Sequence, residues 1–133
     1  MTAADTLQDD RRCFACGPDN QTGLQMHFDY EPDVARCRVV PNPNFSGWSD
    51  MLHGGVVATL LDEAMAHAAI AAGVRAVTAR LEVRFRKAVP IGAPLVLEGK
   101  IVGRRGKMLD AVARLSGEDG TLYAEGSSRF ISQ

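Results

Sequence analysis

The sequence lacks an apolar run long enough to cross a membrane. Its longest apolar stretch, residues 56–72, is interrupted by Asp62, Glu63 and His67, whereas a spanning helix needs about 20 predominantly apolar residues. The first ten residues contain neither a basic segment nor an apolar one, so we expect no secretory signal peptide. These absences predict a cytoplasmic protein without a membrane partner.

The sequence also has almost no net charge. Its 15 Lys and Arg residues nearly balance 16 Asp and Glu residues, which leaves −1 at pH 7. The chain as a whole therefore has no electrostatic attraction to nucleic acid, and no nucleic-acid partner is expected. A length of 133 residues with 46% apolar residues indicates one globular domain.

Cysteine is scarce and odd in number, with Cys13, Cys16 and Cys37 only. This usage predicts reduced thiols rather than a disulfide framework. Cys13 and Cys16 have the spacing of half a zinc site. Only Cys37 and His27 suggest themselves as the other half, and both lie on predicted strands. We therefore expect a structural loop with free thiols, no metal and no redox chemistry, because no helix follows the pair.

The sequence does contain one long helix pattern among several strand patterns. A stretch rich in Ala, Leu and Met from about Gly55 to Ala72 predicts a helix that is buried on most sides, with Gly73 at its C-terminal cap. Alternating apolar and polar residues predict strands at 24–30, 34–40, 77–85, 95–102, 108–115 and 122–131.

One helix among six strands suggests an α+β domain with an antiparallel sheet curled around the helix. We expect residues 1–12 to form a flexible N-terminal tail and residues 13–133 to form the domain.

The start of the predicted helix is a candidate anion site. His53, Gly54 and Gly55 precede it directly. The first amides of a helix are unpaired donors at the positive end of its dipole, so they suit an anion or a developing oxyanion. A plain helix entry turn is the alternative.

Two carboxylates interrupt the apolar helix. A buried carboxylate is costly unless it is paired or used. Glu63 can pair with His67, four residues further on. Asp62 has no cationic residue three or four positions away, which makes it a candidate functional residue. An arginine from elsewhere in the fold is the alternative explanation.

These motifs together resemble a known family. The segment GWSDMLHGG at 47–55, with Asp62 after six further residues, resembles the motif of hot-dog-fold thioesterases of the phenylacetate-pathway type. The segments TARLEVRF at 78–85 and VPIG at 89–92 look like the family's next strand and turn. The segment CFACGPDNQTGL at 13–24 is similar to a subgroup that includes thioesterase superfamily members 4 and 5.

The resemblance implies a hot-dog fold and an acyl-CoA thioesterase that releases a free acid and coenzyme A without a cofactor. Asp62 matches the family's catalytic carboxylate, and Gly54 matches the glycine whose amide polarises the thioester carbonyl. Thr78 matches a hydroxyl position that holds the water or the substrate, and its parity in the strand is opposite to that of the apolar residues. The candidate substrate-binding residues are His53, Gly55, Glu63, Arg84 and Arg86.

Arg84 and Arg86 belong to a basic stripe on the strand at 77–85. Arginine suits the phosphates of coenzyme A, although a solvated sheet face with cross-strand ion pairs is the alternative. The turn at 103–107 offers further basic residues that could equally meet these phosphates.

The spacing of the site residues predicts assembly. Gly55 and Asp62 are seven residues apart, which is about 10 Å along a helix. One thioester cannot easily touch both from a single chain, so we expect a site shared between two subunits of a homodimer or homotetramer.

Two rival functions remain open on the sequence. One is a hot-dog hydratase, although its characteristic Asp and His are missing from the loop at 41–44. The other is a non-catalytic acyl-CoA-binding module, which would keep the cleft but not a water-contacting Asp62.

Overall fold

The computed structural model describes residues 7–133, so residues 1–6 of the expected tail lie outside the described residues. Within residues 7–133 the chain forms one α-helix, one 3-10 helix and six strands. In chain order these are β1 (Phe28–Glu31), β2 (Val34–Val39), η2 (Pro43–Phe45), α1 (Gly54–Ala71), β3 (Ala76–Phe85), β4 (Leu95–Arg105), β5 (Met108–Gly117) and β6 (Leu122–Ser132).

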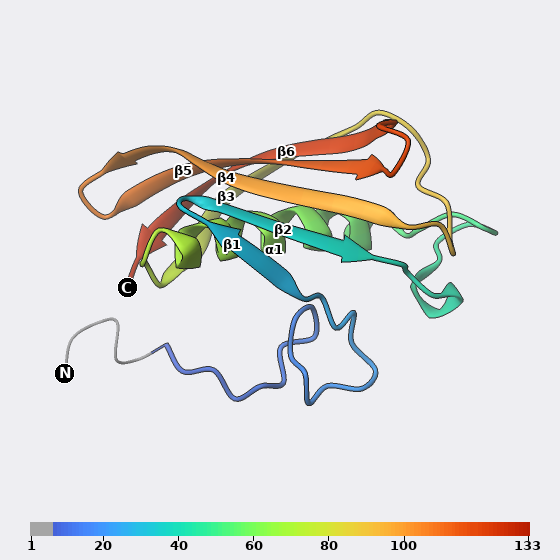
Figure 1. The fold of residues 1–133 in the computed structure, drawn as a ribbon, viewed down its shortest axis with the longest axis horizontal. Helices are drawn as coiled ribbons and strands as arrows, with labels where there is room; N and C mark the ends of the chain where they lie inside the picture. The colour runs from blue at the N-terminus through green and yellow to red at the C-terminus, as the bar shows by residue number, and fades with distance from the viewer. Residues whose placement is uncertain (1–6) are drawn as a thin grey trace.

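The strands of the described chain form one antiparallel sheet in the order β1-β2-β4-β5-β6-β3. Figure 1 shows this sheet lying across α1, with the longest strands over the middle of the helix. The predicted α+β architecture, an antiparallel sheet wrapped around one long helix, is confirmed. No helix within residues 7–133 is long and apolar enough to span a membrane.

The fully buried side chains of the helix recur every three or four residues and form one stripe along it, whereas burial on most sides was predicted. Its fully covered side chains are Val57, Leu60, Leu61, Ala64, Met65, Ala68 and Ala69. The sheet approaches most closely at Gly99 on β4, where a Cβ atom would overlap the backbone carbonyl of Ala64. Glycine is therefore required at this position for the helix to lie against the sheet.

Both ends of α1 are capped by the residues that flank it. His53, in an extended conformation, is the N-cap, so the helix begins at Gly54, one residue before the predicted start. At the other end Gly73 has a positive φ of 81°. Its N–H donates to Ile70 and that of Val74 donates to Ala69, which is the Schellman arrangement predicted from the glycine.

The first predicted strand begins later than expected. Gln25 has a φ of 52°, a left-handed conformation that interrupts a strand. The amides of Leu24 and Met26 instead donate to the carbonyls of Phe14 and Ala15. The segment at 24–27 is therefore tied to the N-terminal loop, and only residues from Phe28 onward join the sheet.

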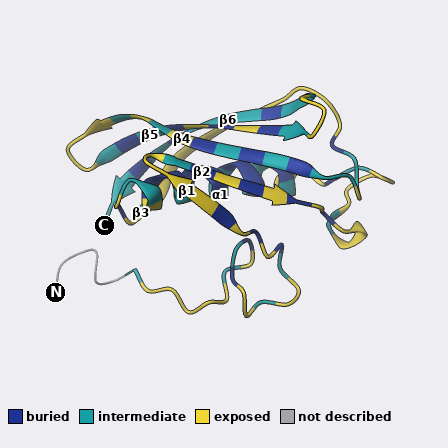
Figure 2. Ribbon diagram, in the orientation of Figure 1, coloured by how far each residue is buried: buried dark blue, intermediate teal, exposed yellow. Residues whose placement is uncertain are grey.

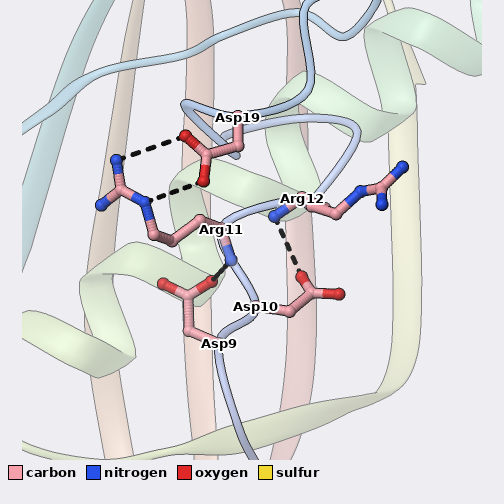
Figure 3. A network of polar contacts seen from close by, with 5 residues as sticks. All are labelled: Asp9, Asp10, Arg11, Arg12 and Asp19. Carbon is pink, nitrogen blue, oxygen red and sulfur yellow. Dashed lines mark hydrogen bonds and ion pairs between the residues drawn. The ribbon is translucent and has the colours of Figure 1, made fainter.

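The start of the described chain makes contacts with that loop. The Arg11 guanidinium bonds the carboxylate of Asp19, with Nε 3.0 Å from Oδ2. The amides of Arg11 and Arg12 donate to Asp9 and Asp10 respectively, as Figure 3 shows. Of these contacts, only the Arg11–Asp19 pair joins the segment to the loop, and the other two lie within residues 9–12.

Strand β3 lies at an edge of the sheet, where it pairs with β6 alone among the described strands. Most of its residues are exposed, including Val77, Leu81 and Phe85. By contrast, the helix-facing positions of β4 are buried, and Figure 2 shows that strand alternating between buried and intermediate residues. One long edge of the sheet is thus left uncovered in a single chain.

Candidate active site

The carboxylate of Asp62 meets the hydroxyl of Thr78 between the helix and the edge strand. The Thr78 hydroxyl donates a hydrogen bond of 2.8 Å to Oδ1 of Asp62. Burial raises the pKa of the Asp62 carboxyl above its ordinary value, the hydrogen bond from Thr78 lowers it, and neighbouring Glu63 raises it. The net shift is upward, so the site holds a carboxylate of increased basicity.

A β-bulge brings Thr78 to this position. The pairing of β3 with β6 shifts register between Thr78 and Arg80, so Ala79 is an extra residue in the strand. As a result Thr78 shares the helix-facing side with Leu81 and Phe85 rather than lying opposite them. The expectation from strict alternation was wrong at this point, because one extra residue reverses the side on which every following residue lies.

The helix N-terminus presents one open amide. Nδ1 of His53 accepts the N–H of Gly55 at 2.9 Å, so that donor is already used. The amides of Val56 and Val57 donate to the carbonyl of His53. Within residues 7–133 the N–H of Gly54 has no hydrogen-bond acceptor. His53 thereby selects Gly54 as the free donor of the two glycines.

A groove of about 450 Å³ opens beside this amide. His53 and Gly54 line it together with Phe85, whose ring would lie 3.8 Å from a Cβ atom on Gly54. Trp48, on the loop before the helix, is 81% exposed and forms part of the groove wall. An apolar group with an oxygen directed at Gly54 fits this mixture of aromatic walls and one polar donor.

Asp62 is not among the residues that line the groove. It lies eight residues after Gly54 on α1, which is about 12 Å along the axis. The two groups expected to act on one substrate are therefore separated within a single chain. This is the separation that the sequence predicted from Gly55 and Asp62.

The basic residues considered for binding coenzyme A differ in whether they line the groove and in whether they are already paired. Arg86 lines the groove, but its guanidinium is bound to Glu125 at 2.6 and 2.8 Å. Arg84 lies on the exposed outer face of β3, away from the groove. Lys87, which also lines the groove, has no ion pair within residues 7–133. Lys87 is thus the basic residue of the groove lining that makes no ion pair within the described residues.

The basic turn at 103–107 lies at the other end of the helix. Lys107 accepts the N–H of Ser132 through its carbonyl, and the next residue, Gln133, donates its N–H to Arg75. Arg75 follows the C-terminus of α1, so this turn is remote from His53 within one chain (Figure 1).

Glu63 is next to Asp62 in the chain, but its side chain points away from Asp62 and Thr78. Its carboxylate lies 3.3 Å from Nε2 of His67, as the spacing predicted, and 3.9 Å from the thiol of Cys13. Burial and then the charge of Glu63 raise the pKa of the neighbouring Cys16 thiol. The structure therefore does not bring Glu63 to Thr78 or to the groove, where a substrate-binding role would require it.

Comparison with known proteins identifies the family. Residues 50–124 match the thioesterase superfamily. The chain belongs to the thioesterase superfamily. The match includes His53, Gly54, Asp62 and Thr78, so the candidate site falls inside the part of the chain that defines the superfamily.

Curated relatives match this thioesterase-superfamily chain over part of their length. Acyl-coenzyme A thioesterase THEM4 of Xenopus laevis is 26% identical over 71% of this chain and 43% of its own. Acyl-coenzyme A thioesterase THEM5 of Mus musculus is 29% identical over 71% of this chain and 39% of its own. The chain thus matches about two fifths of the length of these relatives.

Solved structures confirm the fold. A crystal structure of a thioesterase superfamily protein has a TM-score of 0.86 and 25% identity, and the match covers 91% of this chain and 60% of that one. The PaaI protein of the E. coli phenylacetic acid degradation operon has a TM-score of 0.77 and 15% identity, over 83% of this chain and 80% of that one. The hot-dog fold expected from the resemblance is therefore confirmed.

The Asp62–Thr78 contact predicts a measurable titration. In Thr78→Val the hydroxyl donor is lost, so the pKa of the Asp62 carboxyl should rise further above its ordinary value of 3.8. Thr78→Ser keeps the donor and should titrate like the unmodified protein. Carbon-13 NMR of the aspartate carboxyls measures both. An unchanged or lowered Asp62 pKa in Thr78→Val would show that the hydrogen bond does not control this carboxylate.

Proposed function

We propose that this chain hydrolyses acyl-CoA thioesters to a free acid and coenzyme A, in a site shared between two copies of the chain. The observation that carries the proposal is that α1 presents two different functional groups at two separate places. Its N-terminus offers a free amide in an apolar groove, and its middle offers a half-buried carboxylate outside that groove. Thioester hydrolysis needs both groups on one substrate.

The groove residues suit the reacting carbonyl and the acyl chain. The N–H of Gly54 donates to the thioester oxygen and stabilises the negative charge that develops there, aided by the positive end of the helix dipole. Phe85 and Trp48 provide an apolar surface for the acyl group. Lys87, at the same groove, meets the phosphates of coenzyme A, which a cation binds favourably.

Asp62 then supplies the attack on the carbonyl carbon. Its carboxylate either adds to that carbon directly, which gives an acyl anhydride that water then cleaves, or removes a proton from a water that adds. In both cases the C–S bond breaks, and coenzyme A leaves as a thiolate that takes up a proton. Thr78 fixes one carboxylate oxygen through its hydrogen bond, which leaves the second oxygen for the substrate or the water. The raised pKa of Asp62 favours proton removal, because a more basic carboxylate is the better acceptor.

Assembly through β3 accounts for how the two groups meet. Thr78, bound to Asp62, lies near one end of β3, and Phe85, against Gly54, lies at the other. These positions are roughly 20 Å apart along a strand. If two copies of β3 pair in antiparallel fashion about a two-fold axis, the Asp62 end of one copy lies beside the Gly54 end of the other.

The surface of β3 supports this pairing. Its outer edge has backbone donors and acceptors without partners within the described chain, a feature that favours strand addition. Leu81 and Phe85 on its helix-facing side are 38% and 56% exposed. A second copy would cover these side chains and satisfy the edge, so we infer a homodimer at least.

The known relatives agree with this substrate class. THEM4 and THEM5 are named acyl-coenzyme A thioesterases. A Streptococcus mutans protein of similar fold, 16% identical with a TM-score of 0.77 over 81% of this chain and 88% of that one, was crystallised with acetyl-CoA. Asp62 argues against a purely binding module. A half-buried acid of raised pKa costs folding free energy unless it is used.

Replacing Asp62 tests the chemistry directly. Asp62→Asn keeps the shape of the side chain but removes the nucleophile and the base, so kcat should fall by roughly a hundredfold or more. Release of free coenzyme A from a panel of acyl-CoA esters, followed with a thiol reagent, measures it. KM should change much less, because the lost interaction acts in the transition state.

The matched control is Asp110→Asn, the same change on an exposed carboxylate paired with Arg129. Its kcat should stay near the unmodified value. Near-normal hydrolysis by Asp62→Asn would show that Asp62 is not the catalytic acid, whereas no hydrolysis of any ester in the panel by the unmodified protein would favour the binding-module alternative. Loss of activity in Glu63→Gln but not in Asp62→Asn would move the catalytic assignment to Glu63.

The Gly54 amide can be removed without breaking the helix. Proline is favoured at the first helical position, and His53 already has the extended conformation that precedes proline, with φ −61° and ψ 136°. Gly54→Pro should therefore fold but lose about a hundredfold to a thousandfold in kcat, the usual result of losing an oxyanion donor.

Gly54→Ala is the control, because it retains the N–H and its Cβ would make only an ordinary contact, 3.8 Å, with Phe85. Steady-state rates of both variants, with circular dichroism to check the helix, decide the role. Equal activity of the Pro and Ala variants would exclude Gly54 as the donor.

A further inference from the structure

A second group of reactive side chains lies on the other side of α1 from Thr78. Cys13 and Cys16, from the N-terminal loop, meet Glu63 from the helix. One possible ligand atom from each of the three residues lies within 4.8 Å of the other two, and all three residues are partly buried. The thiol of Cys13 is 3.9 Å from Oε1 of Glu63.

The sequence alone did not identify Glu63 as a neighbour of the two cysteines. The spacing of the two cysteines indicates half a metal site, but Cys37 and His27 were the residues considered for the other half. The structure instead supplies Glu63, whose carboxylate was assigned to His67 alone. The loop at 13–24 ends 30 residues before the helix begins at Gly54, and only the fold brings the two together.

One carboxylate oxygen of Glu63 lacks a hydrogen-bond donor in this position. Its Oε2 atom is buried and makes no hydrogen bond within residues 7–133. It lies 3.3 Å from Nε2 of His67, but without hydrogen-bond geometry. A buried carboxylate oxygen without a donor is unusual and costly. Two thiols beside it add acidic groups and supply no balancing positive charge.

His67, which lies next to this carboxylate, is itself held in place by two contacts. Nδ1 of His67 is hydrogen-bonded to the hydroxyl of Tyr30 at 2.8 Å. The imidazole also stacks on Phe28, with the ring centroids 4.1 Å apart. His67 is thus held with Nε2 facing Glu63. Metal-binding carboxylates are commonly oriented by such second-layer partners.

We propose that Cys13, Cys16 and Glu63 bind one divalent cation of the zinc class, with His67 as the residue that positions Glu63. Two thiolates and one carboxylate are ligands that zinc accepts in a tetrahedral site. Ligand atoms of such a site are about 3.5 Å apart, since metal–ligand bonds are about 2.0 to 2.3 Å long. The observed spacing needs only a small contraction to reach this.

Three protein ligands leave the fourth position to water. A hollow lined by Cys16, Tyr30 and His67 opens to the surface beside the group, which gives an ion a path of entry. Each cysteine that binds the cation releases its proton to solvent. The cation then supplies the positive charge that the buried carboxylate lacks, and it fastens the N-terminal loop to α1, one residue from Asp62.

The proposal is tested on the full chain without a histidine tag, purified under reducing conditions. Metal analysis should find about one zinc per chain after reconstitution and dialysis. Titration of the metal-free protein with cobalt should give a thiolate-to-cobalt charge-transfer band with a stoichiometry of one. Cys13→Ser and Cys16→Ser should each lose the band and retain less than about a tenth of the zinc.

Two further variants separate ligation from general loss of structure. Cys37→Ser changes a buried cysteine that lies outside the group and should keep full zinc content. His67→Gln should bind cobalt on the order of tenfold to a hundredfold more weakly while keeping the band, as expected of a positioning residue.

Two results would overturn the proposal. One is reconstituted protein that holds no zinc and gives no cobalt band, with its thiols shown to be reduced. The other is a Cys13–Cys16 disulfide in protein alkylated at cell lysis, without bound metal. Neither depends on hydrolysis of acyl-CoA, so the proposed function could fail or succeed independently.

Discussion

The structure depends on the close contact between α1 and the sheet. At Gly99 the backbone of β4 touches the backbone of the helix near Ala64, and any side chain there would overlap the helix. This contact buries α1 on the sheet side and fixes its rotation about its own axis. The direction in which each remaining helix residue points is then determined by sequence position alone.

Asp62 and Glu63 illustrate the consequence. As consecutive residues they point in directions about 100° apart on a helix. Asp62 reaches the edge strand and the hydroxyl of Thr78, whereas Glu63 reaches the cysteine loop and His67. One helix therefore supplies a catalytic candidate on one side and a candidate metal ligand on the other. The two side chains carry the same functional group, so the difference between their proposed roles comes from the residues that each one contacts.

The edge strand β3 connects the fold to the proposed assembly. It leaves one side of the sheet unfinished, with exposed apolar residues and unpaired backbone groups in the described chain. It also carries the two ends of the proposed site, since Thr78 contacts Asp62 and Phe85 lines the groove together with Gly54. In the proposed assembly, a second copy of the chain would complete both the sheet edge and the site.

Local patterns predicted the fold well, and long-range contacts account for what they missed. The helix and its Gly73 cap follow from composition and spacing, and the site motif at 47–62 follows from its resemblance to the family. The bulge at Ala79 was missed because a perfectly alternating sequence does not indicate an extra residue. The meeting of Cys13 with Glu63 was missed because it depends on how the N-terminal loop lies against α1.

Complementation between two inactive variants tests the shared site most directly. Asp62→Asn and Gly54→Pro are mixed in equal amounts, unfolded and refolded together, and acyl-CoA hydrolysis is measured. Half of the dimers should be hybrids, and each hybrid has one site with both groups intact, so about a quarter of the unmodified activity should return. If Gly54 and Asp62 of the same chain formed each site, every site would lack one group and no activity would return.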